Sequence, residues 1–308
     1  MSHTIKYIAN PAQKYALEAA LEMNQPLLVT GEPGTGKTEM ADWALDFLNQ
    51  KNPGAFYPEV LRFNTKTISK ATDLFYTYDA LSHFQAANLR GERTVPTEKF
   101  ITLNAFGRAI AYSDPARTEF AEKFGLELPQ KPLNSVVLID EVDKAPRDFT
   151  NDLLDEILNY RFAIRELPGF AAQKAPAANI VVILTSNSEK NLPDAFLRRC
   201  AFFHIEFPKG QHLRDIVELH LGKISEQAKD SYNLLFDFFE ETREKSVRKA
   251  PATAELIAWL RILGMKGFHT ADAARRRELL ERNLSFLVKT KDDLDAVKEL
   301  LEKTQKDI

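Results

Sequence analysis

The sequence has a single cysteine, Cys200, and no strong excess of either charge sign. One cysteine excludes an internal disulfide, and it excludes a zinc site built from several cysteines. The 41 lysine and arginine residues are balanced by 44 aspartate and glutamate residues, for a formal net charge of −3. This balance argues against a protein whose main activity is bulk electrostatic binding to nucleic acid or to an anionic membrane.

Long hydrophobic runs are also missing. Nothing approaches about eighteen consecutive apolar residues, so we expect no membrane span. The N-terminal stretch MSHTIKYIANPAQKYALEAAL lacks a continuous apolar segment and is unlike a secretory signal peptide. Together with the lone cysteine, these absences predict a reducing, cytoplasmic location.

The chain has 308 residues, and its length suggests two domains at roughly 150 residues each. Residues 1–208 alternate short apolar runs with amphipathic helical patterns, whereas residues 209–308 show helical patterns alone. We therefore expect an α/β core over 1–208 and a helical domain over 209–308.

Alternating strands and helices in the first domain predict an α/β fold with a parallel central sheet and helices on both faces. The segments that predict buried or partly buried strands are 27–30, 59–63, 136–139, 161–167 and 179–184. Helices are predicted over 38–48 and from Pro146 onward. In the second domain, helices are expected near 211–222, 230–245, 252–264 and 272–287, followed by a charged tail helix.

A glycine-rich loop follows the first predicted strand. Its sequence GEPGTGKT matches the pattern G-x-x-x-x-G-K-[ST] in full. Glycines let successive backbone N–H groups turn inward around phosphate oxygens, and the next helix adds its positive N-terminal end. Lys37 is placed for the β- and γ-phosphates, and the Thr38 hydroxyl for Mg²⁺. We assign these residues, with the one that follows, to nucleotide binding: Gly31, Glu32, Pro33, Gly34, Thr35, Gly36, Lys37, Thr38 and Glu39.

Two acidic residues, Asp140 and Glu141, follow the apolar run VVLI directly. A carboxylate at the tip of a buried strand beside the nucleotide strand can hold Mg²⁺, so Asp140 joins Thr38 as a candidate metal ligand. Glu141 would then point toward the γ-phosphate and could polarise a water for in-line attack. The structural alternative is that both residues cap the helix beginning near Pro146.

Two further polar segments complete the candidate site. The buried run NIVVIL ends in Thr185-Ser186-Asn187, and the amide of Asn187 could hold the attacking water or sense the γ-phosphate. Arg198 and Arg199 follow in LPDAFLRRC, where an arginine could reach a neighbouring subunit's nucleotide and neutralise transition-state charge. A turn former and two surface arginines are the alternatives that these residues leave open.

These elements, in this order and followed by a helical domain, resemble the AAA+ ATPases. GEPGTGKT resembles the Walker A motif, VVLIDE the Walker B motif, and Asn187 matches the sensor 1 position. The phrases PLLVTGEPGTGKT, DEVDKAP and RFAIRELPG resemble the MoxR branch, which includes dynein-related proteins with a single module. The resemblance implies a P-loop αβα sandwich with a helical lid, an ATPase using ATP and Mg²⁺, and an arginine finger at Arg199, with Arg198 as the second choice.

The MoxR resemblance also implies a homo-oligomer, a ring of six subunits, that remodels a partner protein in the manner of a chaperone. Partners in this branch often carry a von Willebrand A-type domain. An insert is implied at about 74–92, and a hairpin at about 160–180. The sequence departs from the family at the sensor 2 arginine, because that position falls on Thr253 or Ala254; Arg248 or Lys249 could substitute.

Two other functions stay open. A nucleic-acid motor, such as a restriction-type translocase, is supported only by Arg275-Arg276-Arg277 with Arg282, and these residues are interleaved with Glu278 and Glu281 as on a solvated helix face. A small-molecule kinase would share the loop but would not require Glu141, Asn187 and Arg199. Binding to nucleic acid is therefore not expected.

Overall fold

The computed structural model describes residues 7–90, 95–146, 149–150, 153, 157, 159–188, 192–225, 228–246 and 248–303. The chain forms two compact units. The first contains Ala9–Gly31 and Gly36–Ile205, and the second contains Glu32–Thr35 and the described residues after Ile205.

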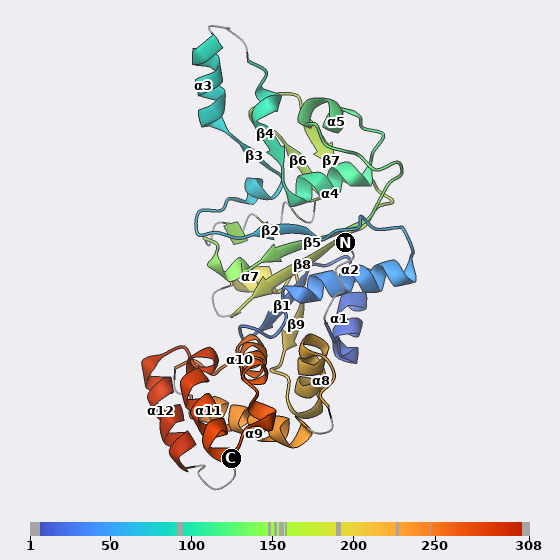
Figure 1. The fold of residues 1–308 in the computed structure, drawn as a ribbon. Helices are drawn as coiled ribbons and strands as arrows, with labels where there is room; N and C mark the ends of the chain where they lie inside the picture. Colours follow the sequence, from blue (N-terminus) through green and yellow to red (C-terminus); the bar gives the residue numbers. More distant parts are fainter. Residues whose placement is uncertain are drawn as a thin grey trace. The chain divides into compact units, whose positions relative to one another are not determined.

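A five-stranded sheet lies at the centre of the first unit, with strand order β2-β5-β8-β1-β9 (Figure 1). All of its neighbouring strands run parallel. The strands are β1 (Leu27–Gly31), β2 (Leu61–Asn64), β5 (Ser135–Asp140), β8 (Ile180–Ser186) and β9 (Ala201–Ile205). The predicted parallel α/β fold is confirmed. The edge strand β9 was not predicted.

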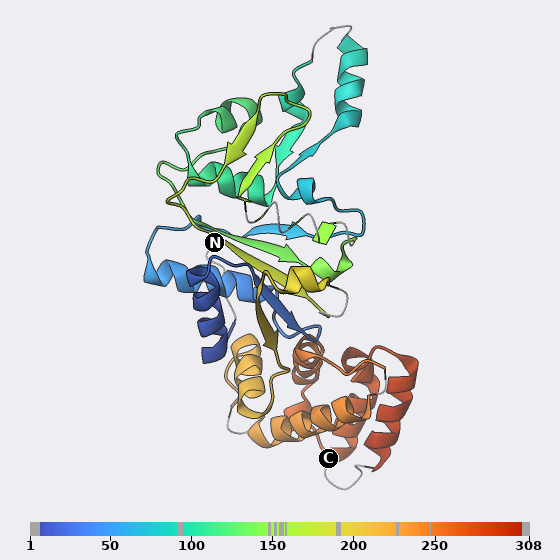
Figure 2. The same ribbon diagram turned by 180° about the vertical axis from the view of Figure 1, so that it is seen from behind.

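Helices cover both faces of this sheet, and Figures 1 and 2 show α2 and α4 on opposite sides of it. Strands β5 and β8 are buried along almost their whole length, which is why VVLI and IVVIL are continuous apolar runs. The helices of this unit are α1 (Pro11–Glu22), α2 (Glu39–Lys51), α3 (Ala80–Arg90), α4 (Ala105–Ser113), α5 (Glu119–Phe124) and α7 (Asp194–Leu197). The helix predicted from Pro146 lies partly outside the described residues.

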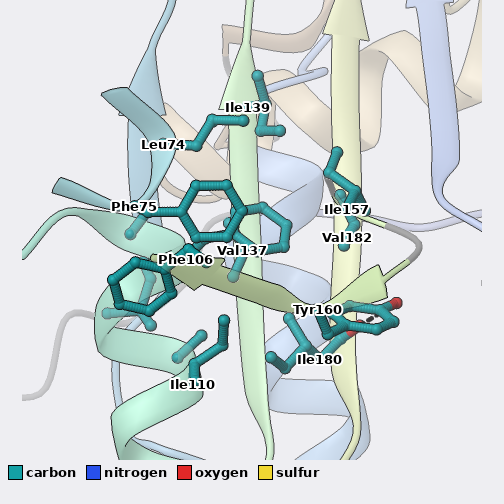
Figure 3. Close-up of a cluster of buried hydrophobic side chains, with 14 of the residues drawn as sticks. Leu74, Phe75, Phe106, Ile110, Val137, Ile139, Ile157, Tyr160, Ile180 and Val182 are labelled. Atoms are coloured by element: carbon teal, nitrogen blue, oxygen red, sulfur yellow. Dashed lines mark hydrogen bonds between the residues drawn. The ribbon is translucent and has the colours of Figure 1, made fainter. Parts of the chain in front are cut away.

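The main core of the unit lies between the sheet and α4 (Figure 3). Val137 and Ile139 of β5 and Val182 of β8 face this cluster, where they meet Phe106 and Ile110 of α4. All five side chains are at most 3% exposed. Side chains alternate along a strand, so Val136 and Leu138 of β5 and Val181 and Ile183 of β8 point to the opposite face, where they are also buried.

Two small antiparallel hairpins complete the first unit. The first pairs β3 (Tyr76–Tyr78) with β4 (Ile101–Leu103), and α3 lies between them in sequence. The second pairs β6 (Arg161–Ala163) with β7 (Ala171–Gln173), which confirms a hairpin within 160–180. The insert expected at 74–92 contains β3 and α3, and its residues 91–92 lie outside the described part of the chain. Short 3₁₀ helices occur at η1 (Ala71–Leu74), η2 (Thr97–Phe100) and η3 (Val142–Lys144).

The second unit is helical throughout the residues that the structure describes, apart from loops. Its helices are α8 (Gly210–Leu221), α9 (Lys229–Lys245), α10 (Thr253–Met265), α11 (Ala273–Leu287) and α12 (Lys291–Lys303), with a 3₁₀ turn at η6 (Phe268–Thr270). Trp259, Phe239 and Phe268, each 0% exposed, lie in its core. The four predicted helices and the tail helix are confirmed. None of the helices described in either unit is long and apolar enough to cross a bilayer.

Candidate functional site

The glycine-rich loop connects the end of β1 to the start of α2, as the sequence predicts. Gly34 and Gly36 have φ angles of 77° and 84°. These left-handed conformations favour glycine, because a Cβ atom would crowd the backbone there. Inside the loop, the Thr35 hydroxyl donates to the Glu32 carbonyl at 2.8 Å. Gly36 is the second glycine of the pattern G-x-x-x-x-G-K-[ST], and Gly34 occupies one of its variable positions, so both glycines stand where the backbone geometry favours them.

Lys37 is the buried cation of this loop. Its side chain is among the buried polar groups, with 8% exposure, and its ammonium donates to the Gly31 carbonyl at 2.9 Å. Burial lowers the pKa of Lys37, while the carboxylates of Asp143, Asp140 and Glu141 act in the opposite direction. The positive charge of the loop thus lies within electrostatic reach of the acidic residues that follow β5.

Asp140 is held between hydroxyl groups from two other elements. The Thr38 hydroxyl lies 3.2 Å from each of its carboxylate oxygens. The Thr185 hydroxyl, at the end of β8, donates to Oδ1 of the same carboxylate. Carboxylate and hydroxyl oxygens are ligands that Mg²⁺ accepts in phosphate-binding sites. The chemistry and placement of Thr38 and Asp140 therefore fit the metal position expected from the sequence.

Glu141 departs from strand geometry immediately after β5. Its φ and ψ angles are 55° and 50°, in the left-handed region that few non-glycine residues adopt. Its N–H donates to the Thr185 hydroxyl at 2.9 Å, and its carboxylate forms an ion pair with Lys144. The hydrogen bond with Glu141 is the main cause that raises the pKa of Lys144. The side chain of Glu141 remains partly exposed, as a group that must meet a ligand requires.

Asn187 lies just beyond β8, close to the acidic residues. Its backbone N–H donates to Oδ1 of Asp143 at 3.3 Å, and its side chain is exposed. Across the described residues, no hydrogen bond joins the Asn187 amide to Asp140 or Glu141. Its position at the strand end agrees with the sequence, whereas its role stays a prediction.

Arg198 and Arg199 end the turn after α7, and both side chains are exposed. Their backbone N–H groups donate to the carbonyls of Asp194 and Phe196, which fixes the turn. Among the residues that the structure describes, neither guanidinium forms a hydrogen bond or an ion pair with Asp140 or Glu141. The structure does not add either arginine to the group of residues around the loop.

The two basic residues that could substitute for the sensor 2 arginine form ion pairs within the second unit. Arg248 forms an ion pair with Asp292 at 2.7 Å, and Lys249 lies 3.9 Å from Glu255.

On α11, three of the four arginines of the basic stretch pair with glutamates on the same helix. These pairs are Arg275–Glu278, Arg277–Glu281 and Arg282–Glu278. Arg276 instead donates to the carbonyls of Phe268 and His269. This stretch is therefore a solvated face with its charges largely balanced.

Two residues of the site were not assigned from the sequence. Thr185 precedes the predicted sensor residue by two positions, and Lys144 follows Glu141 by three. The polar end of NIVVIL was the only signal for Thr185, because its contacts depend on how β8 is aligned with β5. No sequence pattern distinguished Lys144 from a surface lysine.

A comparison with protein families matches residues 27–209 to the "ATPase family associated with various cellular activities (AAA)". The chain belongs to this family. The matched range covers more than half of the 308 residues and includes every element that carries the loop, Asp140, Glu141 and Asn187. AAA proteins are nucleotide-binding ATPases, and that general description applies to this chain; members of the family commonly form oligomers. A comparison with curated proteins gives no match.

Among solved structures, this AAA chain is similar to a single-substitution variant of the RuvB protein of Thermotoga maritima. The identity is 13% and the TM-score 0.45, over 92% of this chain and 69% of that one. It is also similar to domain III of the replication initiation protein DnaA of Thermotoga maritima. There the identity is 15% and the TM-score 0.43, over 90% and 95% of the two chains. These similarities concern the fold alone.

Proposed function

We propose that this AAA protein is a Mg²⁺-dependent ATP hydrolase of the MoxR-like branch, coupled to remodelling or chaperone-like activation of a partner protein. The observation that supports ATP hydrolysis is that residues from two different strands come together at the carboxyl ends of the central sheet. Lys37 and Thr38 come from the loop after β1, and Asp140 comes from the end of β5, two strands away. The Thr38–Asp140 hydrogen bonds join the two segments directly.

Each group has one part in the proposed reaction. The loop amides and Lys37 would bind the phosphates, and Thr38 and Asp140 would hold Mg²⁺, whose charge would offset the negative charge of the phosphates. Glu141 orients and polarises the attacking water, and Asn187 contacts that water or the γ-phosphate. The remaining loop residues, from Glu32 to Gly36 with Glu39, belong to the nucleotide-binding segment.

The exposure of Arg198 and Arg199 supports an arginine that acts on a neighbouring copy. A contact of this kind is head-to-tail, and head-to-tail contacts close into rings when the rotation allows. We propose a homo-oligomeric ring of six subunits, with Arg199 as the first choice for the finger. A core over 1–208, a lid over 209–308 and a cytoplasmic location belong to the same proposal.

The partner is proposed from the MoxR resemblance, which favours a protein with a von Willebrand A-type domain. The direct test of the partner is a Glu141→Gln protein used as a trap in the presence of ATP. We expect a partner protein to co-purify with the variant in larger amount than with the wild type. Salt-sensitive stimulation of ATP hydrolysis by DNA or RNA would instead support the nucleic-acid motor.

The test of the hydrolase is phosphate release from ATP and Mg²⁺ without any added acceptor. Glu141→Gln should lower kcat by at least about a hundredfold, the usual range for removal of a catalytic base, while ATP binding is retained. Glu59→Gln, at an exposed position of the same unit, is the matched control and should hydrolyse ATP as the wild type does. Hydrolysis by Glu141→Gln at the wild-type rate would show that the assigned base is wrong.

A further inference from the structure

The hydroxyl of Thr185 lies between Asp140, the last residue of β5, and Glu141, the residue that follows it. The register of β5 and β8 pairs Ile139 with Leu184, so the next residue of each strand, Asp140 and Thr185, come side by side. Thr185 is 0% exposed. Its hydroxyl donates to the Asp140 carboxylate and accepts from the N–H of Glu141 at 2.9 Å. A hydroxyl has one proton to donate and lone pairs to accept with, so both bonds can exist together.

The second of these bonds lies at a strained point of the backbone. The N–H that donates it belongs to Glu141, whose φ angle of 55° is uncommon for a residue with a side chain. The β5–β8 pairing ends at Ile139, two residues before Glu141, and the Thr185 side chain supplies the acceptor for the Glu141 N–H instead of a backbone partner. Without this hydroxyl, the Glu141 N–H would lose its acceptor, and no other acceptor among the described residues holds that amide.

The first bond gives the other acidic residue a second hydroxyl donor, from a different element than the loop. The Asp140 carboxylate receives the Thr38 hydroxyl from the loop and the Thr185 hydroxyl from β8. Two donors on different elements restrict the rotation of a carboxylate more than one donor does. Groups that orient a metal ligand in this way typically change metal affinity or activity by about 10- to 100-fold when they are removed.

We propose that Thr185 is a positioning residue, whose single hydroxyl orients both the Asp140 carboxylate and the Glu141 peptide for ATP hydrolysis. Thr185 is 0% exposed, and its hydroxyl is already bonded to Asp140 and to the N–H of Glu141, so we assign it to orienting these residues and not to contacting phosphate. Its role rests on the proposed function, because it acts through Asp140 and Glu141. The neighbouring hydroxyl of Ser186 bonds instead to the Ser188 carbonyl at 2.8 Å, which separates it from this arrangement.

The test compares Thr185→Val with Thr185→Ser in the full chain. Valine keeps the shape of threonine and loses the hydroxyl, whereas serine keeps the hydroxyl and loses the methyl group. At saturating Mg²⁺, Thr185→Val should lower kcat about 10- to 100-fold while KM for ATP stays within about threefold, and it should raise the Mg²⁺ concentration that gives half-maximal rate. Thr185→Ser should stay within about threefold of the wild type in all three quantities, since the hydroxyl alone is required.

The matched control is Thr65→Val, the same substitution just beyond β2, the strand that neighbours β5. The Thr65 hydroxyl is buried and has no hydrogen-bond partner among the described residues, so its loss should leave kcat unchanged. If Thr185→Val does not fold, Thr185→Ala and Thr185→Ser form the replacement pair, and only the alanine variant should lose rate.

Three outcomes would overturn the proposal. The first is hydrolysis by Thr185→Val at the wild-type rate, and the second is an equal loss of rate in Thr185→Ser. The third is a loss of rate in Thr185→Val with an unchanged Mg²⁺ requirement and a matching loss of thermal stability. If the wild type itself releases no phosphate, both the proposed ATP hydrolysis and the proposed role of Thr185 are wrong. If the wild type is active and Glu141→Gln is not, a normal Thr185→Val overturns only the role of Thr185.

Discussion

At the scale of single residues, the environment of Lys37 shows how the loop can keep a buried cation. Desolvation disfavours the charged form of a lysine, and it lowers the pKa of Lys37 accordingly. The Gly31 carbonyl accepts a hydrogen bond from the ammonium, and the acidic residues after β5 favour its charge. The lysine is thus held at the loop before any phosphate is bound, so little reorganisation is needed on binding.

Lys37→Met removes the charge and keeps much of the length of the side chain. We expect ATP affinity to fall by at least about tenfold, since a charge-assisted contact to phosphate contributes about 1.5–3 kcal/mol. Isothermal titration with ATP and Mg²⁺ measures this loss directly. Lys51→Met, at the last residue of α2, the helix that follows the loop, changes a half-exposed lysine and should bind ATP as the wild type does. Equal affinities for Lys37→Met and the wild type would remove Lys37 from the binding site.

At the scale of elements, close packing decides where α4 can lie. Gly107 is on this helix, and a Cβ atom placed on it would lie 2.1 Å from the Phe75 carbonyl oxygen and 3.3 Å from Leu103. The helix therefore approaches the backbone before β3 more closely than any other residue would allow. The same helix contributes Phe106 and Ile110 to the core shown in Figure 3. The close approach at Gly107 therefore also determines where these two side chains pack.

Gly107→Ala should destabilise the first unit, although alanine favours helices. On an open helix surface the substitution would stabilise by about 1 kcal/mol. Here the clash with backbone should outweigh that gain and lower the free energy of unfolding by about 1–3 kcal/mol. Urea denaturation followed by circular dichroism measures the change. Gly264→Ala is the matched control in α10, where the nearest atom would lie 3.9 Å away, and stability should be equal or higher.

At the scale of the whole molecule, the two exposed arginines after α7 bear on how copies of the chain assemble. Lys37, Thr38, Asp140 and Glu141 lie together in the first unit. The side chains of Arg198 and Arg199 are exposed, and neither guanidinium has a hydrogen-bond or ion-pair partner among the described residues. In the proposed ring, Arg199 would act on the nucleotide of a neighbouring copy, and a finger of this kind contributes about 10³–10⁵ in rate. Assembly and hydrolysis should therefore depend on the same residue.

A mixing experiment tests this dependence. Arg199→Ala and Glu141→Gln should each be nearly inactive alone. A mixture should recover activity, because a Glu141→Gln subunit can supply its arginine to the intact Glu141 of an Arg199→Ala subunit. Random mixing in equal amounts would restore roughly a quarter of the wild-type rate if each interface acts alone. An inactive mixture of subunits that still assemble would contradict a finger acting in trans, and Arg198→Ala in parallel decides between the two arginines.

Parts of the fold that depend on neighbours in sequence were predictable. The loop, its flanking strand and its helix lie within residues 27–51, so composition and spacing were sufficient. The helices of the second unit carry a clear 3.6-residue period. The strand β9 was missed because AFFHI is short and partly exposed at the sheet edge, and it gains its stability from pairing with β1. The three-residue strands β3 and β4 were missed because each is completed only by the other.

The sequence by itself determined the chemistry of this protein: a loop that can bind phosphate, two carboxylates after an apolar strand, and a polar strand end. Those features are local, because each depends on a few consecutive side chains and on backbone angles that glycine permits. Only the tertiary structure decided that β8 lies between β1 and β5, which brings Thr38 to Asp140 and Thr185 to both acidic residues. The order and register of strands follow from packing summed over the whole sheet, and no short segment carries that information.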